Sequence, residues 1–141
     1  MTDINSDLER LVAGGHQGVL VTLRKDGRPQ LSNITYGYAD GAARISVTES
    51  RAKTRNLRRD PRASLYVTTP DFWQWAVADG TAELTPPAAD PNDATVEALV
   101  AYYRDISGEH PNWDEYRAVM VADKRLLLTL RVERIYGQSG R

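Results

Sequence analysis

The chain has 141 residues, no cysteine, and a formal net charge of −1 that comes from 18 basic and 19 acidic side chains. This length suits a single domain with its own hydrophobic core, so we expect residues 1–141 to form one unit. The near-zero net charge argues against a nucleic-acid-binding surface across the domain, and the lack of cysteine excludes disulfides and thiolate chemistry.

The N-terminal sequence MTDINSDLER is polar and acidic. A signal peptide would need a basic start followed by an apolar run, and no apolar stretch approaches the roughly 20 residues of a membrane span. We therefore expect a protein that does not enter a membrane. A cytoplasmic location agrees with the absence of cysteine, because the cytoplasm keeps thiols reduced.

The first half of the chain predicts a short helix over residues 6–14, which two glycines end. The apolar period then changes to that of strands, which we expect at residues 18–23, 29–38 and 43–48. An Asp-Gly dipeptide between the first two strands is typical of a hairpin turn. A second helix follows, with Ser50 as its predicted N-cap and Pro61 as its stop.

The second half predicts further strands, then two helices, then a return to strand. The expected elements are strands at 63–68 and 72–84 with a bulge at Gly80, a proline-rich loop at 85–93, helices at 94–106 and 113–122, and strands at 125–133 and 134–137. Asn112 and Glu115 hold capping-box positions at the start of the last helix. The whole chain thus predicts six or seven strands and three or four helices.

This order of elements predicts a mainly β, α+β fold. Hairpin-connected strands with helices inserted late favour an antiparallel sheet that closes on itself, with the helices packed at one side. A doubly wound nucleotide-binding fold would need strands and helices to alternate. Neither GxGxxG nor GxxxxGK occurs, so no glycine-rich phosphate loop is predicted.

The segment TESRAKTRNLRRDPR, residues 48–62, contains six of the eighteen basic residues. Placing positive charge in a first helical turn is unfavourable unless an anion binds there, where free backbone N–H groups also favour a phosphate. Helical spacing directs Leu57 to the core and Arg58 and Arg59 to water. The residues that we rank first for an anion site are Arg51, Lys53, Arg55 and Asn56. A merely solvated basic helix face is the alternative.

Few reactive side chains accompany this basic segment. His16 and His110 are the only histidines and have no ligand-spaced partner, so no metal site is predicted, and no motif identifies a catalytic residue. A phosphate site with so few reactive groups suits a cofactor that carries the chemistry itself.

Polar and aromatic strand residues could complete such a site. Gln30, Ser32 and Asn33 could contact a ligand, or be ordinary outward-facing polar residues. A flat wall for a ring system could come from Trp73, Trp75, Tyr36 and Tyr38. Aromatic residues at alternating strand positions are, however, often core or subunit-interface residues.

Four segments together carry a family resemblance: DGRPQLSN, ISVTESRAKTRNLRRDPRASL, WAVADGTAELTPP and EALVAYYRDISGEHPNWDEYRAVMVADKRLLLTL. They resemble the actinobacterial deazaflavin-dependent reductases of the flavin/deazaflavin oxidoreductase B group, in the pyridoxamine 5'-phosphate oxidase-like superfamily. The resemblance extends from about Leu8 to Tyr136, and the block RAKTRNLRRDPRAS is its most specific part.

The resemblance implies a split β-barrel of the FMN-binding type, forming a homodimer with two sites at the subunit interface, each binding coenzyme F420. The positions matching the family's phosphate and tail contacts are Arg51, Lys53 and Asn56, with Thr54 and Arg55 beside them. Those matching the strand along the deazaflavin ring are Gln30, Ser32 and Asn33. Near the ring and ribityl chain lie Val47, Thr48 and Ser50. The segment that the partner subunit brings to the site contains Trp75 and Val77.

The implied reaction is hydride transfer from reduced F420 to a small electron-poor conjugated or quinone-like compound, with water, Tyr36 or Tyr38 as the proton source. Two alternatives stay open. The same fold could use FMN, as pyridoxamine-phosphate oxidases do. Both cofactors bear a phosphate, so the basic segment does not distinguish them. The protein could also bind F420 or another anionic ligand without turnover.

Overall fold

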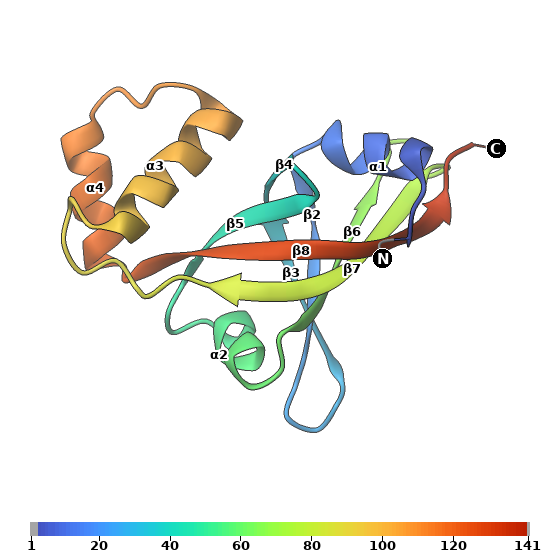
Figure 1. Ribbon diagram of the computed structural model, residues 1–141, viewed down its shortest axis with the longest axis horizontal. Helices are drawn as coiled ribbons and strands as arrows, with labels where there is room; N and C mark the ends of the chain where they lie inside the picture. The colour runs from blue at the N-terminus through green and yellow to red at the C-terminus, as the bar shows by residue number, and fades with distance from the viewer. Residues whose placement is uncertain (1–2, 141) are drawn as a thin grey trace.

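The computed structural model describes residues 3–140 (Figure 1). Its eight strands and four helices are β1 (Asp3–Ile4), α1 (Ser6–Ala13), β2 (Gln17–Leu23), β3 (Pro29–Thr35), β4 (Gly37–Ala39), β5 (Ala42–Thr48), α2 (Ala52–Arg59), β6 (Arg62–Thr68), β7 (Trp75–Leu84), α3 (Ala94–Ser107), α4 (Trp113–Ala122) and β8 (Arg125–Gln138). No helix within residues 3–140 is long and apolar enough to cross a membrane.

The strands form one curled sheet in the order β3-β2-β6-β7-β8-β5-β4, and all neighbours in this order are antiparallel. The short β1 adds a parallel pairing to β8. The sheet curls far enough for the end strand β3 to contact β5, which lies near the other end of the order. This arrangement confirms the predicted α+β split barrel.

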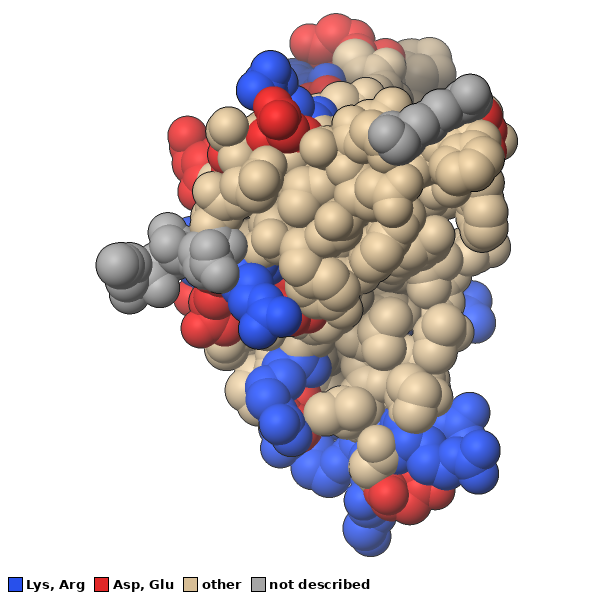
Figure 2. Space-filling model, turned by 90° about the vertical axis from the view of Figure 1, so that its right-hand side faces the viewer, with Lys and Arg blue, Asp and Glu red and all other residues tan. Residues whose placement is uncertain are grey.

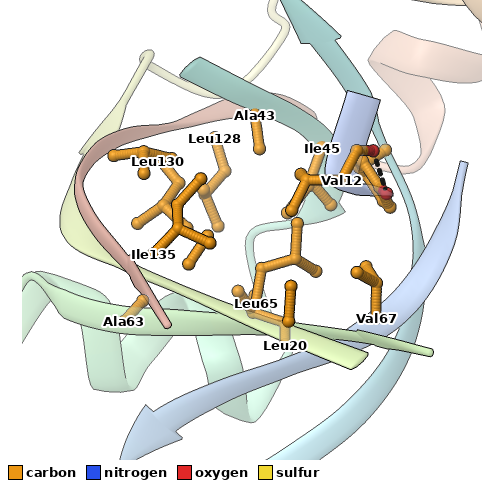
Figure 3. Packing of buried hydrophobic residues seen from close by; sticks show 14 of the residues in the cluster. Val12, Leu20, Ala43, Ile45, Ala63, Leu65, Val67, Leu128, Leu130 and Ile135 are labelled. Atoms are coloured by element: carbon orange, nitrogen blue, oxygen red, sulfur yellow. Dashed lines mark hydrogen bonds between the residues drawn. The ribbon is translucent and has the colours of Figure 1, made fainter. Parts of the chain in front are cut away.

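The main hydrophobic core fills the inside of the curled sheet (Figure 3). Alternate residues of the strands point inward, so Leu20, Leu65 and Leu128 are fully buried from three different strands. Helix α1 closes one end of this core with Leu8 and Val12, as its apolar spacing predicts.

A second hydrophobic cluster lies beneath the α3–α4 pair, which stands to one side of the sheet (Figure 1). Its members are Ala88, Val96, Leu99, Val100, Tyr116, Met120 and Leu127. Leu127 belongs to β8, so this cluster attaches the helices to the outside of the sheet. The predicted placement at one side is thereby confirmed for the two helices that come late in the chain, α3 and α4 (Figure 1).

The predicted single strand over residues 29–38 is wrong, because the chain changes partners within it. β3 pairs with β2, whereas β4 pairs with β5 at the other end of the sheet. Tyr36 lies between them, is fully buried, and donates its hydroxyl to the Val12 carbonyl at 2.5 Å, a bond drawn as the dashed line in Figure 3. Residues 125–137, predicted as two strands, form the single strand β8.

The bulge predicted at Gly80 is confirmed. The register between β7 and β8 shifts between Asp79 and Gly80, where Glu133 is the extra residue of β8. A Cβ atom on Gly80 would lie 2.1 Å from the carbonyl oxygen of Arg131. Only glycine therefore allows the two backbones to approach this closely.

Candidate functional site

A cavity of about 580 Å³ lies where the two ends of the curled sheet approach each other. Its lining comes from β3, β5, the start of α2, the α3–α4 pair and the start of β8: Ser32, Asn33, Ile34, Thr35, Ser46, Val47, Thr48, Arg51, Lys53, Tyr102, Tyr103, Tyr116, Met120 and Arg125. A neighbouring cavity of about 460 Å³ shares residues 33–35, but no charged residue of the described part of the chain lines it. We therefore place the candidate site in the first cavity.

The structure brings part of the predicted set together in this cavity. The predicted residues that line it are Ser32, Asn33, Val47, Thr48, Arg51 and Lys53. Those that do not are Gln30, Ser50, Thr54, Arg55, Asn56, Trp75 and Val77. The last two lie on β7, so a site contribution from them would require a second subunit.

The start of α2 differs from the prediction by one residue. Arg51, not Ser50, is the N-cap, and its side chain makes no capping hydrogen bond. The reason is a turn before the helix, in which the Arg51 N–H donates to the Thr48 carbonyl at 3.3 Å. The Thr54 hydroxyl donates to the same carbonyl at 2.7 Å, which explains why Thr54 is buried away from the cavity.

Asn56, predicted to contact the ligand, lies outside the cavity lining and is bonded within the protein behind it. It is 8% exposed, and its amide nitrogen donates to Thr22 Oγ1 at 3.1 Å. Thr22 in turn donates to Gln30 Oε1 at 2.6 Å, so Gln30 is also engaged. This chain of hydrogen bonds joins α2 to β2 and β3 and thereby positions the helix start.

Arg59 belongs to the same network. It is exposed, as expected, yet its guanidinium donates to the Leu23 carbonyl at 2.7 Å and to Asn56 Oδ1 at 3.1 Å. Arg58, also exposed, pairs with Glu49 at 2.5 Å. The two later arginines of α2 therefore bind the protein itself instead of being merely solvated.

We predict that Arg59→Ala lowers the free energy of unfolding by about 1 kcal/mol, because it removes the donor from two acceptors. Arg55→Ala is the matched control, because Arg55 is exposed on the same helix and its side chain makes no hydrogen bond among residues 3–140. Urea denaturation of both variants measures the difference. Equal stability of the two variants would contradict a structural role for Arg59.

The cavity is strongly positive. Its lining contains Arg51, Lys53 and Arg125, whereas no Asp or Glu of residues 3–140 belongs to it. Burial, followed by the charges of Arg51 and Arg125, lowers the pKa of Lys53. In Figure 2, Lys and Arg side chains, with some Asp and Glu among them, gather at the lower end of the molecule, where Figure 1 places α2 and the β2–β3 hairpin. The three cations that line the cavity belong to none of the ion pairs within residues 3–140, and such cations favour an anionic ligand.

Tyrosines of the α3–α4 pair form the opposite wall of the cavity. Tyr102 donates its hydroxyl to the Thr35 carbonyl, and Tyr116 donates to the Leu99 carbonyl, both at 2.9 Å. Burial raises the pKa of Tyr116 to about 12. Tyr103 also lines the cavity, and Met120 adds apolar surface.

Within one copy of the chain, the cavity lining includes none of the four residues suggested from sequence as an aromatic wall: Trp73, Trp75, Tyr36 and Tyr38. Tyr36 is fully buried in the main core, and the Tyr38 hydroxyl donates to Glu9 Oε2 at 2.6 Å away from the cavity. Neither tyrosine can serve this cavity as a proton source. Tyr102 and Tyr103, adjacent in the AYYRD segment, could have been noticed in the sequence. They line the cavity only because α3 packs beside β5, and the periodicity of the sequence does not reveal that packing.

The backbone of β3 has a free edge beside the cavity, because β3 is an end strand that pairs with β2. The Tyr36 N–H donates to the His16 carbonyl at 2.8 Å, which fixes the alternation of hydrogen-bonded pairs along the ladder. By that alternation the N–H and C=O groups of Asn33 and Thr35 point away from β2. Tyr102 already uses the Thr35 carbonyl. Asn33 presents a backbone donor and acceptor side by side.

Within residues 3–140, no group of three or more His, Asp or Glu side chains is arranged to hold a metal ion. The cavity instead combines three cations, a free strand edge and a tyrosine wall. Its lining would suit an elongated ligand with an anionic end and a flat polar ring.

The family model for pyridoxamine 5'-phosphate oxidase matches residues 4–139. The chain belongs to this family. This match confirms the pyridoxamine 5'-phosphate oxidase-like superfamily that was expected from the sequence.

Solved structures share the family fold. An F420 reductase is 22% identical, with a TM-score of 0.72 over 94% of this chain and 98% of that one. A heme-binding protein from Mycobacterium smegmatis is 25% identical, with a TM-score of 0.70 over 99% of this chain and 56% of that one. An FAD-binding protein from Mesorhizobium loti is 18% identical, with a TM-score of 0.68 over 97% and 93%.

Proposed function

We propose that the protein binds coenzyme F420 in this cavity and, in the cytoplasm, transfers a hydride from the reduced deazaflavin to a small electron-poor conjugated or quinone-like substrate. The observation that carries the proposal is the pairing of unneutralised Arg51 and Lys53 with a tyrosine wall in one cavity. A ligand with a phosphate at one end and a ring at the other is complementary to the two cations and to the tyrosine wall.

The residues of the cavity fit such a cofactor. Arg51 and Lys53 would hold the phosphate beside the start of α2, where the helix dipole adds to their charge. The free N–H and C=O groups of Asn33 would meet the polar edge of the ring, and Tyr102 would contact its face. Reduced deazaflavin supplies the hydride when bound, so the protein mainly orients the reactants.

The proton source must differ from the two tyrosines proposed from sequence. Tyr102 and Tyr116 donate their hydroxyls to backbone carbonyls. Tyr103 lines the cavity, and its ring packs against Trp113 at a centroid distance of 5.7 Å. We therefore assign the proton to water or to Tyr103.

F420 is favoured by the resemblance carried by RAKTRNLRRDPRAS, and the F420 reductase of similar fold agrees with it. FMN is the second candidate, since the family is that of pyridoxamine 5'-phosphate oxidase and a structural neighbour binds FAD. Both cofactors carry a phosphate for Arg51 and Lys53. A ligand-binding experiment is needed to separate them.

We further propose that two copies of the chain associate through the outer face of the sheet. Trp75 lies there between Tyr66 and Tyr136, with ring centroids 6.3 and 6.1 Å apart, and Val77 lies between the same two tyrosines in register. Tyr136 remains 41% exposed. A second subunit would cover this aromatic face, and Trp75 and Val77 could then approach the partner's cavity.

Ligand titration of the purified protein tests the proposal. We expect F420 to bind with a change in its fluorescence, and reduced F420 to be oxidised by some members of a panel of enones and quinones. FMN and heme serve as competing ligands. Tight FMN binding without F420 binding would replace the first candidate by the second, and F420 binding without turnover across the panel would favour a carrier.

The affinity for F420 should depend on pH through Lys53. An anion binds the ammonium form, so affinity is fully present below the pKa of free Lys53 and falls as the pH rises through it. Because burial and two neighbouring cations lower this pKa, the fall should begin below the ordinary range for lysine. Lys53→Arg, which stays charged, is the control. A wild-type profile that matches the Lys53→Arg profile would contradict the prediction.

A further inference from the structure

Arg125 is the cation of the cavity that sequence reasoning missed. It is the first residue of β8 and lies opposite Thr48 of β5. Its Nη1 atom makes only long contacts to Ser46, at 3.4 Å to the carbonyl oxygen and 3.3 Å to Oγ. Its Nε atom is buried and has no hydrogen-bond partner among the described residues.

Arg125 also has no carboxylate partner within residues 3–140. The six ion pairs there are formed by Arg10, Arg58, Arg62, Arg104, Arg117 and Arg131. Arg51 and Lys53, the other two cations of the cavity, are likewise absent from these pairs. A partly buried guanidinium without a counter-ion is costly, and its repulsion on Lys53 adds to that cost.

Buried polar atoms without partners are concentrated at this site. Within residues 3–140, the buried side-chain N and O atoms that have no hydrogen-bond partner are Ser32 Oγ, Thr48 Oγ1 and Arg125 Nε, and all three residues line the cavity. Most buried polar side-chain atoms in folded proteins have a partner. Their gathering in one cavity indicates that a polar ligand supplies the missing contacts.

The depth of the three cations differs. Arg51 is exposed and Lys53 is half-buried, whereas Arg125 is half-buried and its Nε atom is fully buried. We propose that Arg125 is an inner anion-binding residue, which contacts a second charged or strongly polar oxygen of the ligand while Arg51 and Lys53 hold the phosphate. This inference deepens the proposed function but requires only a phosphate-bearing ligand.

Inorganic pyrophosphate tests the inference without F420. Calorimetry should show binding to the wild type that weakens about 10-fold or more in Arg125→Met, the cost expected for a contact between charged groups. Arg131→Met is the matched control, because Arg131 lies on the same strand but pairs with Glu83 at the surface. We expect this control to bind pyrophosphate as the wild type does.

A direct measurement covers the case in which Arg125→Met does not fold. In the wild type, an arginine Nε–H resonance that is missing from Arg125→Lys should shift when pyrophosphate is added. No shift, no pyrophosphate binding by the wild type, or unchanged binding by a folded Arg125→Met variant would each overturn the inference. Arg125-dependent pyrophosphate binding without F420 binding would uphold it while rejecting the proposed cofactor.

Discussion

Lys53→Ala is expected to weaken F420 binding by about 1.5 to 3 kcal/mol, the range for a hydrogen bond to a charged group. Lys53 lines the cavity at the start of α2, and its side chain makes no hydrogen bond or ion pair among residues 3–140. Its ammonium is therefore available to a phosphate. Removing the Lys53 ammonium also relieves its repulsion from Arg51 and Arg125. We therefore expect Lys53→Ala to lose affinity for F420 without losing stability.

Fluorescence titration measures this effect, with Arg55→Ala as the control on the same helix. Arg55 is exposed and does not line the cavity, so its removal should change affinity little. Arg59→Ala should also leave affinity nearly unchanged, but its structural bonds make it the poorer control. Equal losses of affinity in Lys53→Ala and Arg55→Ala would refute a specific contact and indicate general attraction by the basic helix.

Gly80→Ala is expected to destabilise the fold by about 3 kcal/mol, the upper part of the range for overpacking. The new Cβ atom would lie 2.1 Å from the Arg131 carbonyl oxygen and 3.2 Å from a methyl group of Leu130. The Arg131 carbonyl is backbone in the middle of the sheet and cannot move aside, so β7 and β8 must separate at the bulge. Urea denaturation followed by circular dichroism measures the loss.

Gly140→Ala is the matched control for this substitution. A Cβ atom at Gly140 would meet nothing within 4 Å, so we expect its stability to equal that of the wild type. A Gly80→Ala variant as stable as Gly140→Ala would mean that the β7–β8 pair opens at the bulge without measurable cost.

Most of the fold follows from local patterns in the sequence. The helix at Ser6–Ala13, the hairpin between β2 and β3, and the bulge at Gly80 all follow from spacing and glycine positions. The break at Tyr36 does not, because β3 and β4 are both extended and differ only in their partners. Which strand β3 or β4 pairs with depends on how the whole sheet curls, and a short stretch of sequence does not determine that.

The candidate site was predictable only in part. Arg51 and Lys53 were identified because charge density and helix position are local properties, and both line the cavity. The angle of Asn56 on the helix shows that it faces the body of the protein, but not that it donates a hydrogen bond to Thr22 there. Tyr102 and Arg125 were missed because their neighbours in space are distant in the chain.

The sequence by itself determined the antiparallel α+β class, the basic start of α2 and the scarcity of reactive side chains. The tertiary structure alone decided which cations share one cavity, which tyrosines face them and which polar residues are already bonded. The physical reason is that charge, propensity and periodicity act over a few residues. A binding cavity is made where β3, β5, α2, α3, α4 and β8 meet, and that meeting is set by the curl of the whole sheet.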